Sequence, residues 1–509
     1  MRNLVNLFFK AYFRQRYNRI IYAANHPIDV QSEVFYSLIN SAKDTEWGRL
    51  HKYREIKTYE DFTRNVPLQD YDSLKPYIQR MMHGERGVLW PGRTKWFAKS
   101  SGTTTDQSKF IPVSMRSLRD CHMKGSRDSM ALFYNYFEQA SLMQNHSMIV
   151  GGSLYPYEPY QKSKIGDVSA IMMYHLPSIG RPFFTPDVET ALLADWDEKI
   201  EKFAQAAVKQ EDVVMIAGVP TWTVLLLERI LKISGKENML EVWPEFQVYF
   251  HGGVSFLPYK KQFEKYFPSS KVKYHEVYNA TEGYFATKVS ADDHDLLLLT
   301  QNGIYYEFIP LDQYSKGIKD TLPLEAVEMG KNYVMVISTI AGLWRFMVGD
   351  TVRFTNTKPY KITISGRTKQ FINVFGEEVM VENTDRAVEL TCKRLGVMVK
   401  EYTVGPLFME NGKNGAHQWL IEFASEEPDI EEFAFLLDQN LRIQNSDYDA
   451  KRFQSMALRQ LELVLIPSGG FESWMKKRGK YGGQHKVPRL ANDRQYVDEI
   501  LNYVSKKYK

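Results

Sequence analysis

The stretch Lys99-Ser100-Ser101-Gly102-Thr103-Thr104-Thr105-Asp106-Gln107-Ser108-Lys109 combines hydroxyl side chains with one glycine and two lysines. It lies between Trp96-Phe97-Ala98 and Phe110-Ile111-Pro112-Val113, and we predict that both flanks are strands. A loop of this composition can wrap backbone N–H groups, hydroxyls and a cation around a polyphosphate, because small residues allow close approach. It is not a Walker A loop, since both that spacing and the following helix are missing. A polar hairpin turn is the alternative.

The bulk composition is typical of a soluble protein with more than one domain. A chain of 509 residues exceeds what one hydrophobic core usually supports. Hydrophobic residues make up 44% and charged residues 25%, which are ordinary values for globular proteins. A net charge of +4 is too weak to indicate nucleic acid, so we expect no nucleic-acid partner.

Cysteine usage indicates a reducing compartment. Cys121 and Cys392 are the two cysteines; they can form no disulfide framework and no zinc signature. No apolar run approaches the roughly 18 to 20 residues of a membrane span, so we expect no integral membrane segment. The apolar stretch after Met1 is interrupted too early for a secretory signal. We therefore predict a cytoplasmic location.

The first helix is expected over Leu4–Ala24, where apolar residues at helical spacing alternate with basic ones. Such a helix usually docks on its own domain. Binding to an anionic membrane surface, as part of a scaffold, is the alternative.

The middle of the chain alternates strands and helices. We predict strands at 148–153 and 213–218, with helices over 114–140 and 191–209 and another starting at Val219-Pro220-Thr221. The apolar face of the 114–140 helix is most simply core; it consists of Met115, Leu118, Met123, Met130 and Leu132. This alternation predicts a large α/β domain.

Two further strands end in turns that carry polar and small residues. The strand at 247–250 leads to His251-Gly252-Gly253-Val254, and the strand at 272–278 leads to Asn279-Ala280-Thr281-Glu282-Gly283. In open α/β sheets, ligands gather at the carboxyl ends of the strands. We expect these turns to share a site.

The C-terminal part begins after two more strands. We predict strands at 334–339 and 343–347 and a turn at 348–351. The domain boundary falls at Ser365, giving a large domain over 1–364 and a smaller, mobile α+β domain over 365–509. Within the small domain we expect helices over 381–396 and 429–441, strands over 418–423 and 461–466, and a glycine- and lysine-rich end at 479–489.

The order of these motifs resembles the adenylate-forming superfamily of acyl-activating enzymes, and within it the Gretchen Hagen family of acyl acid amido synthetases. The resemblance covers nearly the whole chain. It rests on Val66-Pro67-Leu68 with Tyr71, the Ser-Ser-Gly-Thr-Thr loop, the Tyr278–Glu282 turn, Val348-Gly349-Asp350, Ser365-Gly366-Arg367 and Gln484-His485-Lys486-Val487-Pro488-Arg489. One departure is that Phe346-Met347 separates Arg345 from Val-Gly-Asp, which displaces Arg345 from the usual arginine role.

The resemblance implies an ATP-dependent ligase that uses Mg²⁺. A carboxylate would attack the α-phosphate of ATP to give an acyl-adenylate and pyrophosphate, and an amino acid amine would then displace AMP. Such chemistry needs positioning and charge neutralisation more than a nucleophilic side chain. The phosphates would be held by Ser100, Ser101, Thr103, Thr104 and Lys109.

Other site residues follow from the same resemblance. Glu282 would hold Mg²⁺, or else be a solvated turn acid. Asp350 would take the ribose hydroxyls, or else only form a turn. Adenine would lie against the backbone of Gly252, Gly253 and Val254 and stack on the ring of Tyr278, although Tyr278 could instead be a core residue. The turn after Tyr278, which consists of Asn279, Ala280 and Thr281, would belong to the same nucleotide site. Arg367 would reach the ribose or phosphates, unless it is a surface arginine.

Lys486 is the candidate catalytic cation, together with Glu282. On a mobile segment it could neutralise the phosphorus centre and be withdrawn for the amine step, and a solvated lysine is the alternative.

The acyl pocket is less defined; its candidates are Met130, Thr221, Trp222 and Leu225.

The predicted function is therefore an amide-forming ligase acting on a small carboxylic acid and an amino acid, as a monomer or weak homo-oligomer. An acyl-CoA ligase shares the first half reaction, and a catalytically silent nucleotide-binding protein is the non-enzymatic alternative. Pocket residues decide substrates, so plant-hormone substrates do not follow from the resemblance.

Overall fold

The computed structural model describes residues 2–100, 109–155, 162–178, 180–253, 255–368, 371–372, 374, 377, 379–408, 415–452, 458–480 and 486–507. The chain forms two compact units. Unit 1 comprises Met1–Val254, Tyr266–Val348 and Val352–Thr363, and unit 2 comprises Ser255–Lys265, Gly349–Thr351 and Ile364–Lys509. The domain boundary between residues 364 and 365 stays a prediction.

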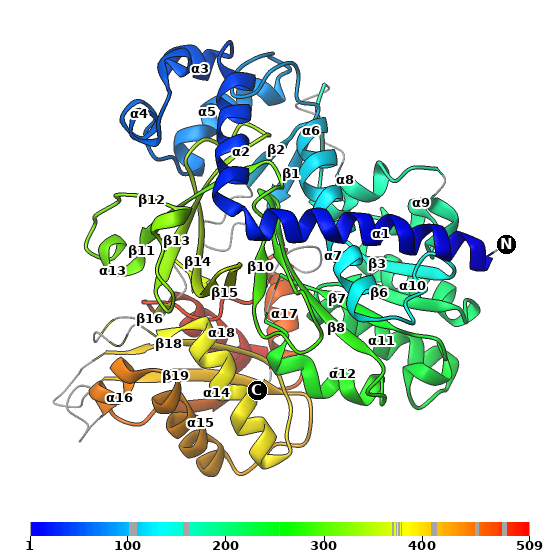
Figure 1. Ribbon diagram of the computed structural model, residues 1–509. Helices are drawn as coiled ribbons and strands as arrows, with labels where there is room; N and C mark the ends of the chain where they lie inside the picture. The colour runs from blue at the N-terminus through cyan, green and yellow to red at the C-terminus, as the bar shows by residue number, and fades with distance from the viewer. Residues whose placement is uncertain are drawn as a thin grey trace. The chain divides into compact units, whose positions relative to one another are not determined.

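Unit 1 begins with a helical segment. Its helices are α1 (Arg2–Asn25), α2 (Pro27–Ala42), α3 (Glu46–Leu50), η1 (Tyr53–Glu55), α4 (Tyr59–Asn65) and α5 (Tyr71–Met82). Helix α1 lies along α7 (Met123–Tyr136; Figure 1). Lys10 Nζ donates to Glu138 O at 2.7 Å, and Arg16 Nε lies 2.6 Å from Asp128 Oδ1. The first helix therefore docks on its own unit, which confirms the prediction.

A four-stranded sheet carries the segments that flank the loop at 101–108. Its order is β2 (Lys109–Val113), β1 (Trp96–Ser100), β5 (Lys164–Gly166) and β4 (Leu154–Tyr155). Strand β1 is antiparallel to β2 and parallel to β5. Ser100 pairs with Lys109, so the two predicted strands bring the ends of the loop together.

A larger sheet consists mostly of unit 1 residues, and parts of its strands β14 and β15 belong to unit 2. Among the described residues its order is β12-β11-β13-β14-β15-β10-β9-β8-β7-β6-β3. The strands are β3 (His146–Val150), β6 (Val213–Gly218), β7 (Val248–His251), β8 (Lys273–Ala280), β9 (Gly283–Thr287), β10 (Leu296–Leu298), β11 (Ile304–Pro310), β12 (Leu322–Pro323), β13 (Asn332–Thr339), β14 (Phe346–Thr357) and β15 (Tyr360–Arg367).

Strands β3, β6, β7 and β8 are parallel neighbours in this sheet. Val213–Ile216 of β6 is almost fully buried, as is typical of parallel strands covered on both faces. The connecting helices are α8 (Val168–Tyr174), η4 (Arg181–Phe183), α9 (Val188–Ala191), α10 (Trp196–Lys209), α11 (Pro220–Ser234), η5 (Met239–Glu241), α13 (Leu311–Tyr314) and η7 (Leu324–Ala326). The α/β prediction for this part of the chain is confirmed.

The long helix predicted over 114–140 is shorter and interrupted. It consists of α6 (Met115–Ser117), a π-helical segment η2 (Leu118–His122) and α7, which ends at Tyr136. The π-helical segment turns Cys121 and His122 into the core, where they are 2% and 1% exposed. Met115 is 57% exposed, so its prediction as a core residue was wrong.

Two predictions near residue 348 also need correction. Residues 348–351 lie inside the continuous strand β14 and form no turn. The strand predicted from Leu343 begins only at Phe346, because Arg345 has a left-handed backbone with φ of 44°.

Unit 2 is an α+β unit. Its elements are η6 (Leu257–Tyr259), α12 (Lys260–Tyr266, whose last residue belongs to unit 1), β16 (Phe371–Ile372), β17 (Val379–Met380), α14 (Val381–Leu395), β18 (Val399–Leu407), β19 (Ala416–Phe423), α15 (Ile430–Gln444), α16 (Ser446–Arg452), β20 (Glu462–Leu465), α17 (Gly470–Lys477) and α18 (Gln495–Lys507). Strand β19 pairs antiparallel with β18 and parallel with β20. The predicted helices and strands match α14, β19, α15 and β20, whereas β18 and α18 were not predicted.

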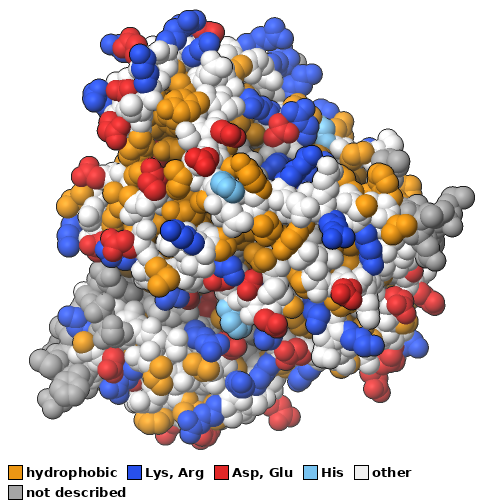
Figure 2. Space-filling view, in the orientation of Figure 1, with side chains coloured by type: hydrophobic (Ala, Val, Ile, Leu, Met, Phe, Trp, Pro, Cys, Tyr) orange, Lys and Arg blue, Asp and Glu red, His pale blue; other side chains and the backbone are white. Residues whose placement is uncertain are grey.

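The surface carries charges of both signs. Lys, Arg, Asp and Glu side chains are interspersed on the face drawn in Figure 2, in keeping with a net charge of +4. Within the described ranges, no helix is long and apolar enough to cross a membrane.

Candidate active site

In unit 1, the carboxyl ends of β7 and β8 bring two of the predicted turns together. The strands are parallel, and His251 at the end of β7 pairs with Glu276 of β8. A Cβ on Gly252 would lie 2.3 Å from Val277 O, so glycine is required where the chain leaves β7 close against β8. Gly253 has a φ of 83°, which also favours glycine. Val254 lies outside the described residues.

The predicted turn at 279–283 is the tip of a hairpin between β8 and β9. Ala280 pairs with Gly283, and Thr281 Oγ1 donates to Glu282 Oε2 at 2.6 Å. The Tyr278 ring is 5% exposed and lies 4.8 Å from the Phe285 ring centroid. Tyr278 is therefore packed in the core at the base of the hairpin, with Glu282 at its tip.

Sequence reasoning missed a buried histidine beside this hairpin. His122 Nδ1 lies 3.4 Å from Asn279 Oδ1, and an amide oxygen can only accept, so Nδ1 donates. Burial lowers the pKa of His122 to about 4, which keeps the ring neutral at pH 7. The π-helical segment places His122 here, and the sequence carried no signal for that turn.

The phosphate-loop candidates are described only in part. Ser101, Thr103 and Thr104 lie outside the described residues, as does the side chain of Ser100. Lys109 Nζ lies 5.8 Å from the centroid of the Tyr71 ring, and the Tyr71 hydroxyl accepts from Phe110 N at 2.9 Å. Tyr71 thus holds the strand that follows the loop, and the roles of the loop residues stay predictions.

In unit 2, three residues assigned separately by the resemblance meet. Arg367 Nε donates to Asp350 Oδ1 at 2.7 Å. Burial and the positive charge of Arg367 together lower the pKa of Lys486 to about 8, and Asp350 opposes both effects. Asp350, Arg367 and Lys486 therefore form one charged cluster, which we call the unit 2 cluster.

Contacts between β14 and β15 explain why Asp350 meets Arg367. Thr368 N donates to Gly349 O at 2.9 Å, and Ser365 Oγ donates to Thr351 Oγ1 at 3.0 Å. These bonds align the two segments side by side. The strand at 348–351, which the sequence did not predict, is therefore what presents Asp350 to Arg367.

Arg489 anchors the chain three residues after Lys486. Its guanidinium forms an ion pair with Glu401, donates to Tyr402 O at 2.9 Å and to Tyr259 Oη at 3.2 Å, and lies 4.4 Å from the Tyr402 ring centroid. In addition, Thr403 Oγ1 donates to Pro488 O at 2.6 Å. These contacts fix the backbone that carries Lys486.

The acyl-pocket candidates lie on two helices. Met130 is half-buried on α7, and Leu225 is half-buried on α11. Trp222, also on α11, is 7% exposed and packs edge-to-face on Trp196 at 4.5 Å. The side chain of Thr221 lies outside the described part of α11. These four assignments stay predictions.

Sequence reasoning also missed a buried lysine of α10, Lys199, which binds the backbone just after β3. Lys199 Nζ donates to Gly151 O at 2.8 Å and to Gly152 O at 2.7 Å. Burial lowers the pKa of Lys199 to about 8, and burial raises the pKa of Asp167, whose Oδ2 accepts from Ser153 N. The sequence did carry a signal, because Lys199 shares the buried helical stripe of Phe203 and Ala207.

Arg345 has a role in the core of unit 1. It is 5% exposed and forms an ion pair with Glu307 at 3.0 Å. It also donates to Val66 O at 2.7 Å and to Thr321 Oγ1 at 2.6 Å. Arg345 is therefore bound within the core, and its displacement from the usual arginine role stays a prediction.

The described residues offer few side chains that could bind a metal ion together. Among the described residues there is no group of three or more His, Cys, Asp and Glu side chains that could hold a metal ion. Mg²⁺ usually takes one or two protein carboxylates and fills its other positions with water and substrate phosphates. Glu282 at the hairpin tip fits that requirement.

This fold, with a large N-terminal α/β domain and a smaller C-terminal domain, is similar to the folds of solved adenylate-forming enzymes. The solved structure of 2-hydroxyisobutyryl-CoA ligase in the postadenylation state matches with a TM-score of 0.59 at 12% identity, covering 94% of this chain and 92% of that one. The GH3.15 acyl acid amido synthetase matches with a TM-score of 0.76 at 15% identity, covering 96% and 95%.

Matches to models of protein families assign the chain to a particular family. The GH3 family N-terminal domain matches residues 16–272, the central domain 297–367 and the C-terminal domain 382–495. The chain belongs to the GH3 family, the Gretchen Hagen family that its motifs resembled.

Named relatives agree with this assignment. Indole-3-acetic acid-amido synthetase GH3.3 of Arabidopsis thaliana is 22% identical, covering 91% of this chain and 89% of the relative. The 4-substituted benzoates-glutamate ligase GH3.12 of the same plant is also 22% identical, covering 88% and 90%.

Proposed function

We propose that this chain is an acyl acid amido synthetase, a ligase that uses ATP to join a small carboxylic acid to the amine of an amino acid. Membership of the GH3 family along most of the chain supports this proposal. The observation that carries it is the unit 2 cluster, because it joins three residues expected to serve one nucleotide.

In the first half reaction, a carboxylate oxygen attacks the α-phosphorus of ATP. The bond from that phosphorus to the bridging oxygen of pyrophosphate breaks, which gives an acyl-adenylate and pyrophosphate. Negative charge builds up around the phosphorus, so fixed cations lower the barrier. The Lys486 ammonium supplies such a charge, and a pKa of about 8 leaves most of it protonated at pH 7.

The neighbours of Lys486 have complementary roles. Asp350 accepts from Arg367 and would offer its carboxylate to the ribose hydroxyls. The Ser100–Lys109 segment holds the β- and γ-phosphates, and Gly252 to Val254 with the Tyr278–Thr281 hairpin border the adenine. Glu282 would hold Mg²⁺, which when bound supplies charge neutralisation on the phosphate oxygens.

In the second half reaction, the amino acid nitrogen attacks the acyl carbonyl carbon. The bond from that carbon to the AMP oxygen breaks, AMP leaves and the nitrogen loses a proton. The acyl group is accepted near α7 and α11, where Met130, Thr221, Trp222 and Leu225 are the candidates. A cytoplasmic location and a monomer or weak homo-oligomer complete the proposal.

Acid-dependent exchange of labelled pyrophosphate into ATP tests the first half reaction. A broad pool of aryl and aliphatic acids is required, because indole-3-acetic acid and 4-substituted benzoates are substrates named for the relatives. Exchange by the wild type that is lost in Glu282→Gln supports adenylation. No exchange from a folded protein that binds ATP favours the silent nucleotide-binding alternative.

The acceptor is then identified with the active acid. Mass spectrometry of reactions containing either the twenty amino acids or CoA separates an amide from a thioester. An amide product supports the proposal, and a thioester formed in preference to any amide contradicts it.

A further inference from the structure

A pocket in unit 1 is built on a row of side chains across the four-stranded sheet. Trp96 of β1 pairs directly with Val113 of β2 on one side and with Lys164 of β5 on the other. Directly paired residues project from the same face of a sheet, so these three side chains stand in line. Trp96 and Val113 are 5% and 2% exposed, whereas Lys164 is exposed.

Two helices complete the apolar side of the pocket. Tyr174 and His175, at the end of α8, contact Trp96 with ring centroids 5.0 and 5.1 Å away. Met115, at the start of α6, reaches the pocket with 57% of its surface exposed. The pocket has a volume of about 420 Å³, inside the range of roughly 300–1,000 Å³ usual for small-molecule sites.

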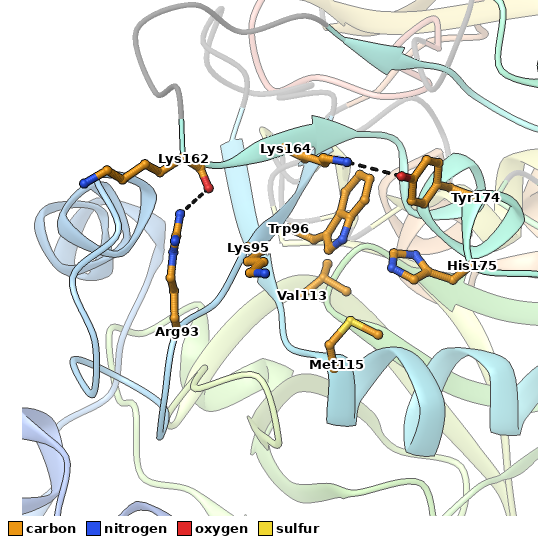
Figure 3. A pocket seen from close by; sticks show the side chains of 9 residues that line it. All are labelled: Arg93, Lys95, Trp96, Val113, Met115, Lys162, Lys164, Tyr174 and His175. Carbon is orange, nitrogen blue, oxygen red and sulfur yellow. Dashed lines mark hydrogen bonds between the residues drawn. The ribbon is translucent and has the colours of Figure 1, made fainter.

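The rest of the pocket lining is cationic. Its lining contains Arg93, Lys95, Lys162 and Lys164 and no acidic side chain. Within the described part of the chain, none of these four cations forms an ion pair. Figure 3 shows Arg93 on one side of the pocket and Tyr174, His175 and Met115 on the other, with Lys164 beside Tyr174 and the Lys162 ammonium directed away from the other labelled side chains.

Several of these groups are held in place before any ligand arrives. Lys164 Nζ donates to Tyr174 Oη at 3.2 Å and lies 5.2 Å from the Trp96 ring centroid. Arg93 Nη2 donates to Lys162 O at 2.5 Å (Figure 3). Fixed side chains lose less conformational freedom on binding, so this arrangement favours a bound anion.

From this division we propose that the pocket binds a phosphate monoester attached to a flat ring. The ring lies against Val113, Met115 and His175, and sulfur–aromatic contact with Met115 favours an aromatic body. The phosphate faces the lysines. A single carboxylate carries one negative charge, whereas a phosphate monoester carries roughly 1.5 to 2 and better matches a lining that holds several cations and no acid.

The pocket is separate from the proposed active site. Trp96 is the first residue of β1 and Ser100 is the last, so the two ends lie roughly 13 Å apart at about 3.3 Å per residue. Residues 101–108 follow Ser100 in the sequence. The pocket therefore adds a second ligand site to the proposed function and does not depend on it.

Isothermal titration of the full chain with 1-naphthyl phosphate tests this site. We expect the wild type to bind and Lys164→Gln to bind about tenfold more weakly, because a fixed charge on the phosphate is lost. Lys162→Gln is the second variant. Lys236→Gln is the matched control, since Lys236 is exposed on unit 1 and does not line the pocket. Added salt weakens the binding.

Three further titrants identify the ligand chemistry. Inorganic phosphate tests the anion without a ring, 1-naphthoate tests the ring with a carboxylate, and uridine 5′-monophosphate distinguishes a nucleotide from another aryl phosphate. Either of the two ring-bearing phosphates binding best supports the proposal. It is overturned if inorganic phosphate or naphthoate binds as tightly, if no titrant binds at millimolar concentration, or if Lys164→Gln and Lys162→Gln bind like the wild type.

Discussion

Two lysines in this molecule share a pKa of about 8 but have different surroundings. Lys199 in unit 1 donates to two backbone carbonyls, so its ammonium is bound to the protein itself. Lys486 in unit 2 lies beside Arg367 and Asp350, in a cluster whose charges suit a nucleotide. A lowered pKa alone therefore does not identify a functional lysine; its neighbours do.

The strongest test of this contrast is to remove the Lys486 charge. We expect Lys486→Ala to lower acid-dependent pyrophosphate exchange by at least about 100-fold, because a fixed cation at the phosphorus centre is lost. Its unfolding midpoint should stay within a few degrees of the wild type. Lys506→Ala, an exposed lysine of α18, is the control and should exchange normally. Equal loss in both variants would remove the special role of Lys486.

Removing the other lysine should affect stability instead of chemistry. Lys199→Met leaves Gly151 O and Gly152 O without their donor, and we expect a loss of about 2–4 kcal/mol in the free energy of unfolding. Urea denaturation measures this change. Exchange per folded molecule should remain close to that of the wild type, and a selective loss of exchange at unchanged stability would reverse the contrast.

Removing the charge of Arg367 tests whether Arg367 and Lys486 interact in the unit 2 cluster. Lys486 acts as an ammonium, so exchange should fall as the pH rises through about 8. Arg367→Gln removes a positive charge that lowers the pKa of Lys486, so the fall should move to higher pH by about half to one unit. The pH profile of exchange measures this shift. A fall that moves to lower pH would contradict the cluster.

A further effect is expected on the pH dependence of stability. Between about pH 8 and 10, unfolded lysine holds a proton that folded Lys199 has released, so the unfolded state binds more protons. The free energy of unfolding should then rise by about 1.4 kcal/mol per pH unit from this group. Lys199→Met should lose that part of the slope in urea titrations, and an unchanged slope would show that Lys199 does not titrate there.

Much of the fold was predictable from local patterns. The strands that flank the Ser100–Lys109 segment, the apolar strand β6 and the helix beginning at Pro220 are each indicated by a few neighbouring residues. Periodicity failed where tertiary packing overrides it. The π-helical segment before α7 includes His122, which contacts Asn279, and the left-handed residue Arg345 forms an ion pair with Glu307. Both partners are distant in the chain.

By itself, the sequence determined the family, the order of the motifs and most of the strands and helices, because these depend on residue types at short spacing. Only the tertiary structure decided which charges meet. It joined Asp350 to Arg367 and Lys486, bound Lys199 and Arg345 within unit 1, and set Lys164 beside Trp96. Electrostatic effects depend on distance and burial, and these quantities exist only after the chain has folded.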